Sequence, residues 1–396
     1  MQEKILDEKK MIKVLLTGGG TGGHVFPALT VAEEILALAE KKKTEIDFLY
    51  IGTLFGMEKK IVKEKGIAYR GILSGKLRRY LDWRNITDGF LISAGFFQAL
   101  TILKKYQPNI VFAKGGFVTV PVVLAARILK IPVIAHESDS VMGLANRLIL
   151  PFVKKMALGF PPDIYKKIPV AKTIFTGNPV RDDILQSDLK KDELFERYHF
   201  YRNRKIILVL GGSQGSSAIN DMVDNVLDEL LEKYIVVHAT GNLGYQYFRE
   251  KREGLSERLK ANYLIFDYIG KELGRFLVHS DLLISRAGAN TLAEIVTLEK
   301  IAIVIPLPSA ASDHQRKNAM FFQKQGLAVV MDEGAFSRED FLTEIERLLH
   351  DKNAREEMKQ KMDNIFPRDS ARQIAKEIFV IISQQKKEKV ELEAGE

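Results

Sequence analysis

Two glycine-rich segments carry the residues of this chain whose types and spacing could do chemistry. Residues 18–24 read Gly-Gly-Gly-Thr-Gly-Gly-His and residues 211–216 read Gly-Gly-Ser-Gln-Gly-Ser, and each segment directly follows a β-branched, aliphatic run typical of a buried strand. A helix that begins in small residues leaves backbone N–H groups free to meet an anion, and its dipole favours negative charge there. The pattern predicts a phosphorylated or nucleotide ligand bound by two similar α/β halves.

His24 stands at the mouth of the first segment. An imidazole titrates close to neutral pH, so this side chain could take a proton from an alcohol as a general base. The alternative is a histidine that caps or fills the turn. Its place beside a phosphate-type loop favours the catalytic interpretation.

The second half offers candidate contacts for such a ligand. Ser213 could donate to a diphosphate oxygen at the start of the following helix. Residues 285–294 also follow a strand and open a helix, where the Glu294 carboxylate could accept two hydrogen bonds from a ribose diol. Gln315, in the polar block 313–318, could bind sugar hydroxyls. Each has a structural alternative: a tight turn, a solvated helix residue and a helix-capping block, respectively.

Short aliphatic runs alternate with amphipathic stretches along the chain. This alternation predicts parallel sheets with right-handed crossovers, in which ligands bind beyond the carboxyl ends of the strands. The expected strands are residues 12–16, 46–51, 110–113, 133–136 and 173–175 in the first half, and 206–210, 235–239, 264–266, 282–285 and 302–305 in the second. The predicted fold class is therefore α/β, with two Rossmann-like halves.

At 396 residues the chain exceeds what one hydrophobic core usually supports. We expect an N-terminal domain over residues 1–180 and a C-terminal domain over 181–370, because the segment 182–205 is strongly charged and too polar to fill a core. Apolar residues at helical spacing predict a further helix over 371–383. The almost entirely polar residues 384–396 are expected to fray into solvent.

Composition excludes several classes of site. The chain has no cysteine, so disulfides, thiolate metal sites and cysteine nucleophiles are excluded. No cluster of side chains has metal-ligand spacing, so we predict no bound metal. The formal net charge of +8 and the pI near 9.2 suit nucleic acid, anionic lipid or an acidic substrate. No helix-turn-helix, zinc-finger or RNA-binding signature accompanies this charge, which disfavours a nucleic-acid partner.

Residues 18–23 also satisfy the dinucleotide-binding pattern G-x-G-x-x-G. A nicotinamide or flavin site needs an acidic residue at the end of the second strand to hold the adenosine ribose. That strand runs here into Gly52, Thr53 and Leu54. The sequence therefore does not favour a dinucleotide, and we predict no cofactor.

Residues 74–104 mix basic residues with large apolar ones. The segment contains Lys76, Leu77, Arg78, Arg79, Leu81, Trp83 and Arg84, followed by an uncharged stretch with Phe90, Phe96 and Phe97. Such a mixture suits the surface of an anionic membrane. The alternative is a core helix over residues 89–103 with a charged approach. We expect neither a secretion signal in the first ten residues nor a stretch that spans a bilayer.

Taken together and in order, these motifs resemble the MurG family of N-acetylglucosaminyl transferases of peptidoglycan synthesis. The resemblance covers about residues 11–380 and rests on GGGTGGHVFP at 18–27, His136-Glu137, GNPVR at 177–181, GGSQG at 211–215, and the segments 285–294 and 313–318. It implies the GT-B fold, in which two Rossmann-like domains with parallel sheets face an interdomain cleft. It also implies that the C-terminal helix returns to the N-terminal domain.

The resemblance further implies the reaction. Members of the family transfer N-acetylglucosamine from its UDP donor to the C4 hydroxyl of the muramoyl sugar of undecaprenyl-diphosphoryl-muramoyl-pentapeptide, lipid I. The product is lipid II, with inversion to a β-1,4 linkage. We therefore expect UDP-N-acetylglucosamine, lipid I and an anionic membrane surface at the cytoplasmic face as partners. Two alternatives stay open: another GT-B transferase acting on a lipid or small aglycone, and a UDP-sugar-binding scaffold without catalysis.

Position by position, the resemblance makes His24 the candidate catalytic base. The residues it assigns to substrate binding are Thr21, Gly22, Gly23, Asp139, Arg181, Ser213, Gln214, Gly215, Ile269, Ala289, Asn290, Thr291, Leu292, Ala293, Glu294 and Gln315. Within this set, Arg181 and Ser213 would contact the diphosphate or nucleotide, and Ile269 would meet uracil through its backbone. Glu294 would hold the ribose.

Two positions depart from the pattern of many family members. Ser138-Asp139 follows His136-Glu137 where many members carry Gln-Asn, and Lys114 precedes two glycines where others carry an uncharged residue. Both variants resemble those of Gram-positive members.

Overall fold

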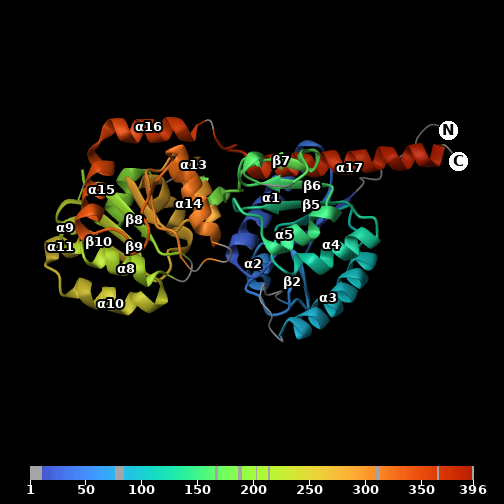
Figure 1. The fold of residues 1–396 in the computed structure, drawn as a ribbon, viewed down its shortest axis with the longest axis horizontal. Coiled ribbons are helices and arrows are strands. Elements are labelled where there is room, and N and C mark those ends of the chain that lie inside the picture. Colours follow the sequence, from blue (N-terminus) through green and yellow to red (C-terminus); the bar gives the residue numbers. More distant parts are fainter. Residues whose placement is uncertain are drawn as a thin grey trace. The chain divides into compact units, whose positions relative to one another are not determined.

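The computed structural model describes residues 11–75, 84–165, 168–185, 190–201, 203–212, 215–308, 310, 313–363 and 365–394. The chain divides into two compact units. Unit 1 comprises residues 1–138, 142–179 and 367–396, and unit 2 comprises residues 139–141 and 180–366. Each unit is built around its own parallel β-sheet with helices packed against it (Figure 1).

Within the described residues, unit 1 has a sheet of seven parallel strands in the order β3-β2-β1-β4-β5-β6-β7. The strands are β1 Ile12–Thr17, β2 Ile46–Thr53, β3 Ala68–Ile72, β4 Ile110–Ala113, β5 Val133–Glu137, β6 Lys155–Leu158 and β7 Thr173–Phe175. The helices are α1 Gly22–Lys41, α2 Glu58–Glu64, α3 Arg84–Tyr106, α4 Thr119–Ile128, α5 Leu144–Ile149 and α17 Ser370–Ala394, with short 3-10 turns at Leu150–Phe152, Pro162–Ile164 and Val170–Lys172.

The described part of unit 2 repeats this plan with six parallel strands in the order β10-β9-β8-β11-β12-β13. The strands are β8 Ile206–Leu210, β9 Ile235–Ala239, β10 Tyr263–Phe266, β11 Leu282–Ser285, β12 Ala302–Val304 and β13 Val329–Val330. The helices are α6 Asp182–Leu185, α7 Lys191–Arg197, α8 Ser217–Asp224, α9 Leu227–Lys233, α10 Gly241–Glu253, α11 Glu257–Lys260, α12 Leu273–His279, α13 Ala289–Thr297, α14 His314–Gln325, α15 Arg338–His350 and α16 Lys352–Met362, with a 3-10 turn, η4, at Gly270–Glu272.

The predicted α/β class with two Rossmann-like halves is confirmed, because each half is a doubly wound parallel sheet. The central strands explain why the sequence could show this. A strand in a parallel sheet that is covered on both faces needs apolar side chains on both faces. In β8, residues 206–209 have no exposed surface, and in β1 the same holds for residues 14–16.

Three strands have no counterpart among the predicted ones, and each carries a weak signal. β3 reads Ala-Tyr-Arg-Gly-Ile, in which arginine and glycine break the apolar run. β6 begins with a lysine, and β13 is only two residues long. Short or interrupted strands at the outer part of a sheet are defined mainly by their neighbours, which the sequence pattern alone does not show.

The C-terminal helix α17 belongs to the core of unit 1. It runs beside α1 (Figure 1), and its residues Ile374, Ile378 and Ile381 are buried in the same cluster as β1 and α1. The expectation that residues 384–396 fray was wrong for residues 384–394, which continue the helix. Glutamine, lysine and glutamate all have good helix propensity, so a polar extension of an anchored helix can stay helical.

The charged linker segment also differs from expectation. Residues 182–205 were expected to be too polar to fill a core, yet Ile184, Leu194 and Phe195 are buried in unit 2. The short helices α6 and α7 place these few apolar side chains on one side while their many charged residues face solvent. A small number of apolar residues at helical spacing is enough to anchor such a segment.

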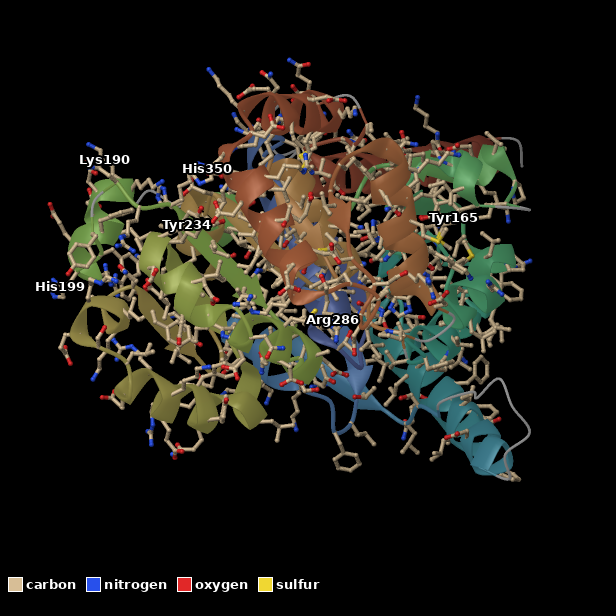
Figure 2. All side chains as sticks on the ribbon, turned by 60° about the vertical axis from the view of Figure 1, so that its left-hand side comes forward. Tyr165, Lys190, His199, Tyr234, Arg286 and His350 are labelled. Atoms are coloured by element: carbon tan, nitrogen blue, oxygen red, sulfur yellow. The ribbon has the colours of Figure 1, made fainter. Side chains whose placement is uncertain are left out.

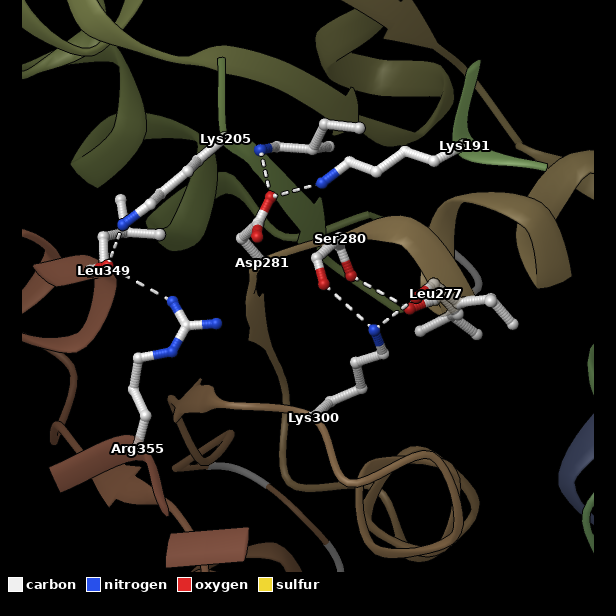
Figure 3. A network of polar contacts seen from close by, with 10 residues as sticks. Lys191, Lys205, Leu277, Ser280, Asp281, Lys300, Leu349 and Arg355 are labelled. Carbon is white, nitrogen blue, oxygen red and sulfur yellow. Dashed lines mark hydrogen bonds and ion pairs between the residues drawn. The ribbon is translucent and has the colours of Figure 1, made fainter. Parts of the chain in front are cut away.

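A polar network fastens the amino ends of β8 and β11 (Figure 3). The Oδ2 atom of Asp281 accepts from the backbone N–H of Ile206 at 2.9 Å and from the Lys191 ammonium at 3.3 Å. Lys300 donates to the carbonyls of Val278 and Ser280 at 2.5 and 3.0 Å, and burial lowers its pKa to about 8. These groups are bonded within the fold and hold the strand starts in register, at the edge opposite the carboxyl ends.

In the described ranges, no helix combines the length and the apolar character needed to cross a membrane.

Candidate active site

The first candidate site lies at the carboxyl edge of the unit 1 sheet. The strand order reverses at β1, which has β2 on one side and β4 on the other, and α/β sheets bind ligands at such a switch point. A Cβ atom on Gly116, after β4, would lie 2.4 Å from the carbonyl oxygen of Gly19, after β1. Gly116 also has a φ of 84°, which favours glycine. Only glycine therefore lets the two loops approach this closely.

His24 lies in the first turn of α1, half-buried beside these loops. Its Nδ1 atom is 2.9 Å from the Gly19 carbonyl oxygen and 3.3 Å from Oγ1 of Thr21. Because a carbonyl can only accept, Nδ1 carries the hydrogen in this bond, and the lone pair of the neutral ring stays on Nε2. A Cβ atom on Gly115 would lie 3.4 Å from Nε2, so the basic nitrogen faces the loop after β4.

The other candidate residues of the first segment sit at the same helix start. Gly22 and Gly23 are the first two residues of α1, and Thr21 occupies the N-cap position without a capping hydrogen bond from its side chain. A helix start of this kind directs backbone N–H groups outward and favours an anion. The structure therefore brings Thr21, Gly22, Gly23 and His24 together.

Lys114 and His136 form a buried polar layer beneath this site. Lys114 is almost fully buried and donates to the Ser138 hydroxyl. His136 bonds through Nε2 to the Gly177 carbonyl at 3.0 Å. Burial lowers the pKa of His136 well below its usual value, and the positive charge of Lys114 lowers it further. His136 is therefore a neutral, structural histidine.

Glu137 holds the start of α5. Its Oε2 atom accepts from the backbone N–H of Gly143 at 2.8 Å and from Nδ2 of Asn146 at 2.9 Å. The same Asn146 amide donates to the His136 carbonyl at 3.0 Å. The histidine and glutamate pair at the end of β5 thus fixes the loop that follows it.

The second candidate site lies at the switch point of the unit 2 sheet, where β8 has β9 on one side and β11 on the other. Gly211 and Gly212 end the described part of the loop after β8, and Gly215 resumes it. Ser213 and Gln214 lie outside the described residues. A Cβ atom on Gly215 would lie 2.5 Å from the Thr240 carbonyl oxygen, so this loop also depends on a glycine.

Arg286 ties the loops of this edge together, and sequence reasoning did not single it out (Figure 2). Its guanidinium donates to the Ser216 hydroxyl at 2.6 Å, to the Ile305 and Pro306 carbonyls at 3.2 and 3.3 Å, and to Glu333 at 2.8 Å. Ser216 in turn caps α8. The signal available in the sequence was one arginine in an otherwise small-residue loop after a buried strand.

Glu294 lies about one and a half turns into α13 and is partly buried. Burial raises the pKa of its carboxyl to about 7. The positive charge of Arg181 lowers this pKa, and the negative charge of Asp183 raises it. Arg181 also pairs with Asp183 at 3.5 Å. The structure thus brings Arg181 and Glu294 into one electrostatic neighbourhood of unit 2, and the alternative of an ordinary solvated glutamate is not what the structure has.

The remaining candidate residues lie on the same sheet edge of unit 2. The first turns of α13, directly after the loop that carries Arg286, contain Ala289, Asn290, Thr291, Leu292 and Ala293.

Gln315 is in the first turn of α14, and its Oε1 atom accepts from the Leu307 N–H at 3.1 Å. Ile269 is buried just before η4. Asp139 belongs to unit 2, where its carboxylate accepts from Nδ2 of Asn318 at 2.9 Å.

Within the part of the chain that the structure describes, no group of three histidine, cysteine, aspartate or glutamate side chains could hold a metal ion.

Solved structures share this fold over almost the whole chain. MurG from Acinetobacter baumannii is 27% identical with a TM-score of 0.69, and the match covers 93% of this chain and 99% of that one. A UDP-GlcNAc 2-epimerase from Neisseria meningitidis, solved with UDP-GlcNAc, has a TM-score of 0.64 at 15% identity, covering 94% and 100%, and shows the fold alone. Two Rossmann-like units of the same strand order define the GT-B class of glycosyltransferases.

Family models and sequence relatives identify the family within this class of glycosyltransferases. The glycosyltransferase family 28 N-terminal domain matches residues 14–158, and the family 28 C-terminal domain matches residues 206–378. The chain belongs to glycosyltransferase family 28. A Clostridium botulinum protein named UDP-N-acetylglucosamine–N-acetylmuramyl-(pentapeptide) pyrophosphoryl-undecaprenol N-acetylglucosamine transferase is 41% identical over 357 residues, which cover 89% of this chain and 96% of that protein. A Clostridium tetani protein of the same name is 40% identical over 337 residues, covering 85% and 89%.

The raised pKa of Glu294 generates a testable pH dependence. By resemblance, Glu294 would accept hydrogen bonds from the ribose diol of UDP-N-acetylglucosamine. The ionised carboxyl is the stronger acceptor, and it predominates only above its pKa of about 7. We expect affinity for this donor to fall as the pH is lowered through neutrality. Glu294→Ala should weaken binding by about 1 to 3 kcal/mol above neutral pH and remove the pH dependence. Isothermal titration calorimetry measures both effects.

Glu229→Gln on α9 is the control for this prediction, because this exposed carboxylate pairs with Arg338 away from the sheet edge. The control should retain the affinity and its pH dependence. Equal donor affinity in Glu294→Ala and the unaltered protein would remove Glu294 from the ribose site.

Proposed function

We propose that this chain transfers N-acetylglucosamine from UDP-N-acetylglucosamine to the C4 hydroxyl of the muramoyl sugar of lipid I, with inversion, and thereby forms lipid II. The observation that carries the proposal is the 41% identity, over 89% of this chain, to a transferase named for the corresponding substrates. The positions of His24 and Glu294 support it, since each lies at the switch-point edge of its own sheet.

The proposed reaction is a single displacement at the anomeric carbon. Nε2 of His24 takes the proton of the C4 hydroxyl while the acceptor oxygen bonds to the anomeric carbon from the face opposite the leaving group. The bond between the anomeric carbon and the diphosphate oxygen breaks, and its electron pair leaves with UDP. A positioned base and a stabilised leaving group are the two requirements of such a step.

Unit 2 supplies the proposed stabilisation of the leaving diphosphate. The helices α8 and α13 begin at its switch point, and helix starts favour anions. Arg181 adds a positive charge in the neighbourhood of Glu294. By resemblance, Arg181 and Ser213 would contact the diphosphate or nucleotide, and Ala289 to Thr291 would bind near the phosphates. Ile269 would meet uracil through its backbone, and Gln315 and Asp139 would contact the sugar. By the same resemblance, Thr21, Gly22 and Gly23 would line the donor sugar and diphosphate.

A different acceptor is the main rival. A UDP-binding half of this kind would serve another GT-B transferase equally well, and a non-catalytic scaffold would also bind the donor. The acceptor half discriminates, because the segment 18–27 and the pair His136-Glu137 belong to the pattern of lipid I transferases. The orientation of His24, with its proton on Nδ1 and its lone pair on Nε2, argues for catalysis over a scaffold.

The direct test uses the purified full chain with labelled UDP-N-acetylglucosamine and a short-chain lipid I analogue. We expect release of UDP and a disaccharide product with a β-1,4 linkage. UDP-glucose and UDP-galactose serve as donor controls and should react far more slowly. Donor hydrolysis without transfer, or transfer only to other lipids or small aglycones, would contradict the proposal.

His24→Ala tests the proposed base. Loss of the proton acceptor should lower turnover by about 10²- to 10⁴-fold while donor binding stays nearly unchanged. Steady-state kinetics gives the turnover, and calorimetry gives the dissociation constant of UDP-N-acetylglucosamine. His199→Ala, at the exposed turn after α7, is the matched control and should keep full activity. An active His24→Ala protein would take this residue out of the role of base.

We propose that one face of unit 1 contacts an anionic membrane at its cytoplasmic side. The helix α3 is buried on one face, at Ala99 and Leu103, and exposes Phe90 and Phe97 on another. The core-helix interpretation therefore describes only one side of α3. Exposed Lys104 lies seven residues after Phe97, on the same helical face. Exposed aromatic rings with nearby basic residues suit an anionic lipid surface.

Vesicle sedimentation tests this surface. Replacing Phe90 and Phe97 together by serine should reduce binding to vesicles that contain phosphatidylglycerol, because the apolar contact is lost. Neutralising Arg78, Arg79 and Arg84 should remove the salt-sensitive part of the binding. Arg78 and Arg79 lie outside the described residues, and the side chain of Arg84 is not described.

Leu243→Ser in unit 2 is the control for the vesicle experiment, because Leu243 is an exposed apolar residue with 97% of its surface accessible to solvent. The control should sediment like the unaltered protein. Undiminished binding of the α3 variants would assign this helix a purely structural role.

A further inference from the structure

One fully buried amide, Asn318 on α14, joins three segments of unit 2. Its Oδ1 atom accepts from the backbone N–H of Ser140 at 2.9 Å and from the Ser140 hydroxyl at 2.7 Å. Its Nδ2 group donates to Oδ1 of Asp139 at 2.9 Å and to the Ala287 carbonyl at 3.3 Å. The side chain has no exposed surface. Four hydrogen bonds thus meet at one carboxamide.

The joined segments carry residues proposed to bind the donor, at its sugar and at its diphosphate. Asp139 is one of them. Ala287 precedes Ala289, the first residue of α13, by two positions. Gln315 is on α14, three residues before Asn318, and residues at this spacing share a helix face. Asn318 is therefore bonded to Asp139 and Ala287 and lies on the same helix as Gln315.

A carboxamide is specific in this position because its two ends differ. The oxygen only accepts, and the nitrogen only donates. The Ser140 groups supply donors, whereas the Asp139 carboxylate and the Ala287 carbonyl supply acceptors, so only one orientation of the amide satisfies all four partners. A buried network that is fully satisfied fixes a single arrangement, because any rotation leaves buried groups unpaired.

We propose that Asn318 is a positioning residue for the sugar end of the donor site. It sets the carboxylate of Asp139 and the backbone at Ala287 relative to Gln315, and so determines how well unit 2 distinguishes UDP-N-acetylglucosamine from UDP alone. This inference rests on the proposed function, since it takes UDP-N-acetylglucosamine as the ligand.

The test compares two ligands in one variant. Asn318→Asp keeps the shape and keeps an acceptor toward Ser140, but it places a second acceptor against Asp139 and Ala287. We expect the dissociation constant of UDP-N-acetylglucosamine to rise about tenfold or more and that of UDP to rise by a clearly smaller factor, because the displaced Asp139 is proposed to contact the sugar, which UDP lacks. Calorimetry with each ligand on the full chain measures the ratio.

The reciprocal double variant separates positioning from simple loss of structure. In Asn318→Asp with Asp139→Asn, the new amide at 139 can donate to the new carboxylate at 318. We expect this exchange to recover a substantial part of the lost affinity for UDP-N-acetylglucosamine. Asn262→Asp is the matched control, since Asn262 is an equally buried amide that bonds to Leu231 and Arg258 before β10. It should leave the ratio of the two constants unchanged.

Ser140→Ala provides a second, milder variant if Asn318→Asp does not fold. It removes one of the two donors to Oδ1 of Asn318 and should raise the ratio of the two constants by a smaller factor. An unchanged ratio in the folded variants, or equal losses for both ligands, would overturn the inference. Failure of the proposed function is distinguishable, because the unaltered protein would then not prefer UDP-N-acetylglucosamine to UDP-glucose.

Discussion

The close approach of Gly116 to Gly19 is the constraint on which the chemistry of unit 1 depends. No side chain fits between the loops after β1 and β4, so the peptide at Gly19 is held against the neighbouring loop. The carbonyl of that peptide accepts from Nδ1 of His24, and this bond leaves the lone pair of the ring on Nε2. The orientation of the proposed base thus follows from backbone contact at a switch point, and a larger residue at position 116 would disturb it.

In unit 2, the loops at the carboxyl edge of the sheet are held in place in a different way. Its sheet has the same strand order, but its edge loops are held by polar side chains, with Arg286 bonded to Ser216, Ile305, Pro306 and Glu333. Buried charged groups of this kind are tolerated only when their bonds are satisfied, and breaking one partner is costly. This edge therefore combines a rigid polar frame with helix starts that can face a diphosphate.

The polar groups at the amino edge and at the carboxyl edge of the unit 2 sheet differ in what they bond to. At the amino edge, Asp281 and Lys300 bond to backbone groups that start or precede strands, and their contacts complete the fold. At the carboxyl edge, Glu294 carries a carboxyl whose pKa burial raises to about 7. A raised carboxyl pKa means that the folded state loses stability as the pH rises from the ordinary value toward 7, which a ligand that donates to the carboxylate can offset.

The sequence pattern predicted the two sheets because buried parallel strands are apolar throughout, and it predicted the glycine loops with His24 because these residues are neighbours in the chain. It did not predict Arg286 or Asn318. Their partners are distant along the chain, because Arg286 and Ser216 are 70 positions apart and Asn318 and Ser140 are 178 positions apart. The pKa of Glu294 depends on burial, which residue type does not reveal. The helical extension of α17 was missed because polarity alone does not exclude a helix.

The most direct measurement of the central claim is the tautomer of His24, read from the ¹⁵N chemical shifts of its ring in histidine-labelled protein and assigned with a His24→Gln variant. The account predicts a neutral ring with the proton on Nδ1 and an unprotonated Nε2 at a pH where the enzyme is active. A proton on Nε2 of the neutral ring would contradict it, because that nitrogen could not then accept the proton of the acceptor hydroxyl.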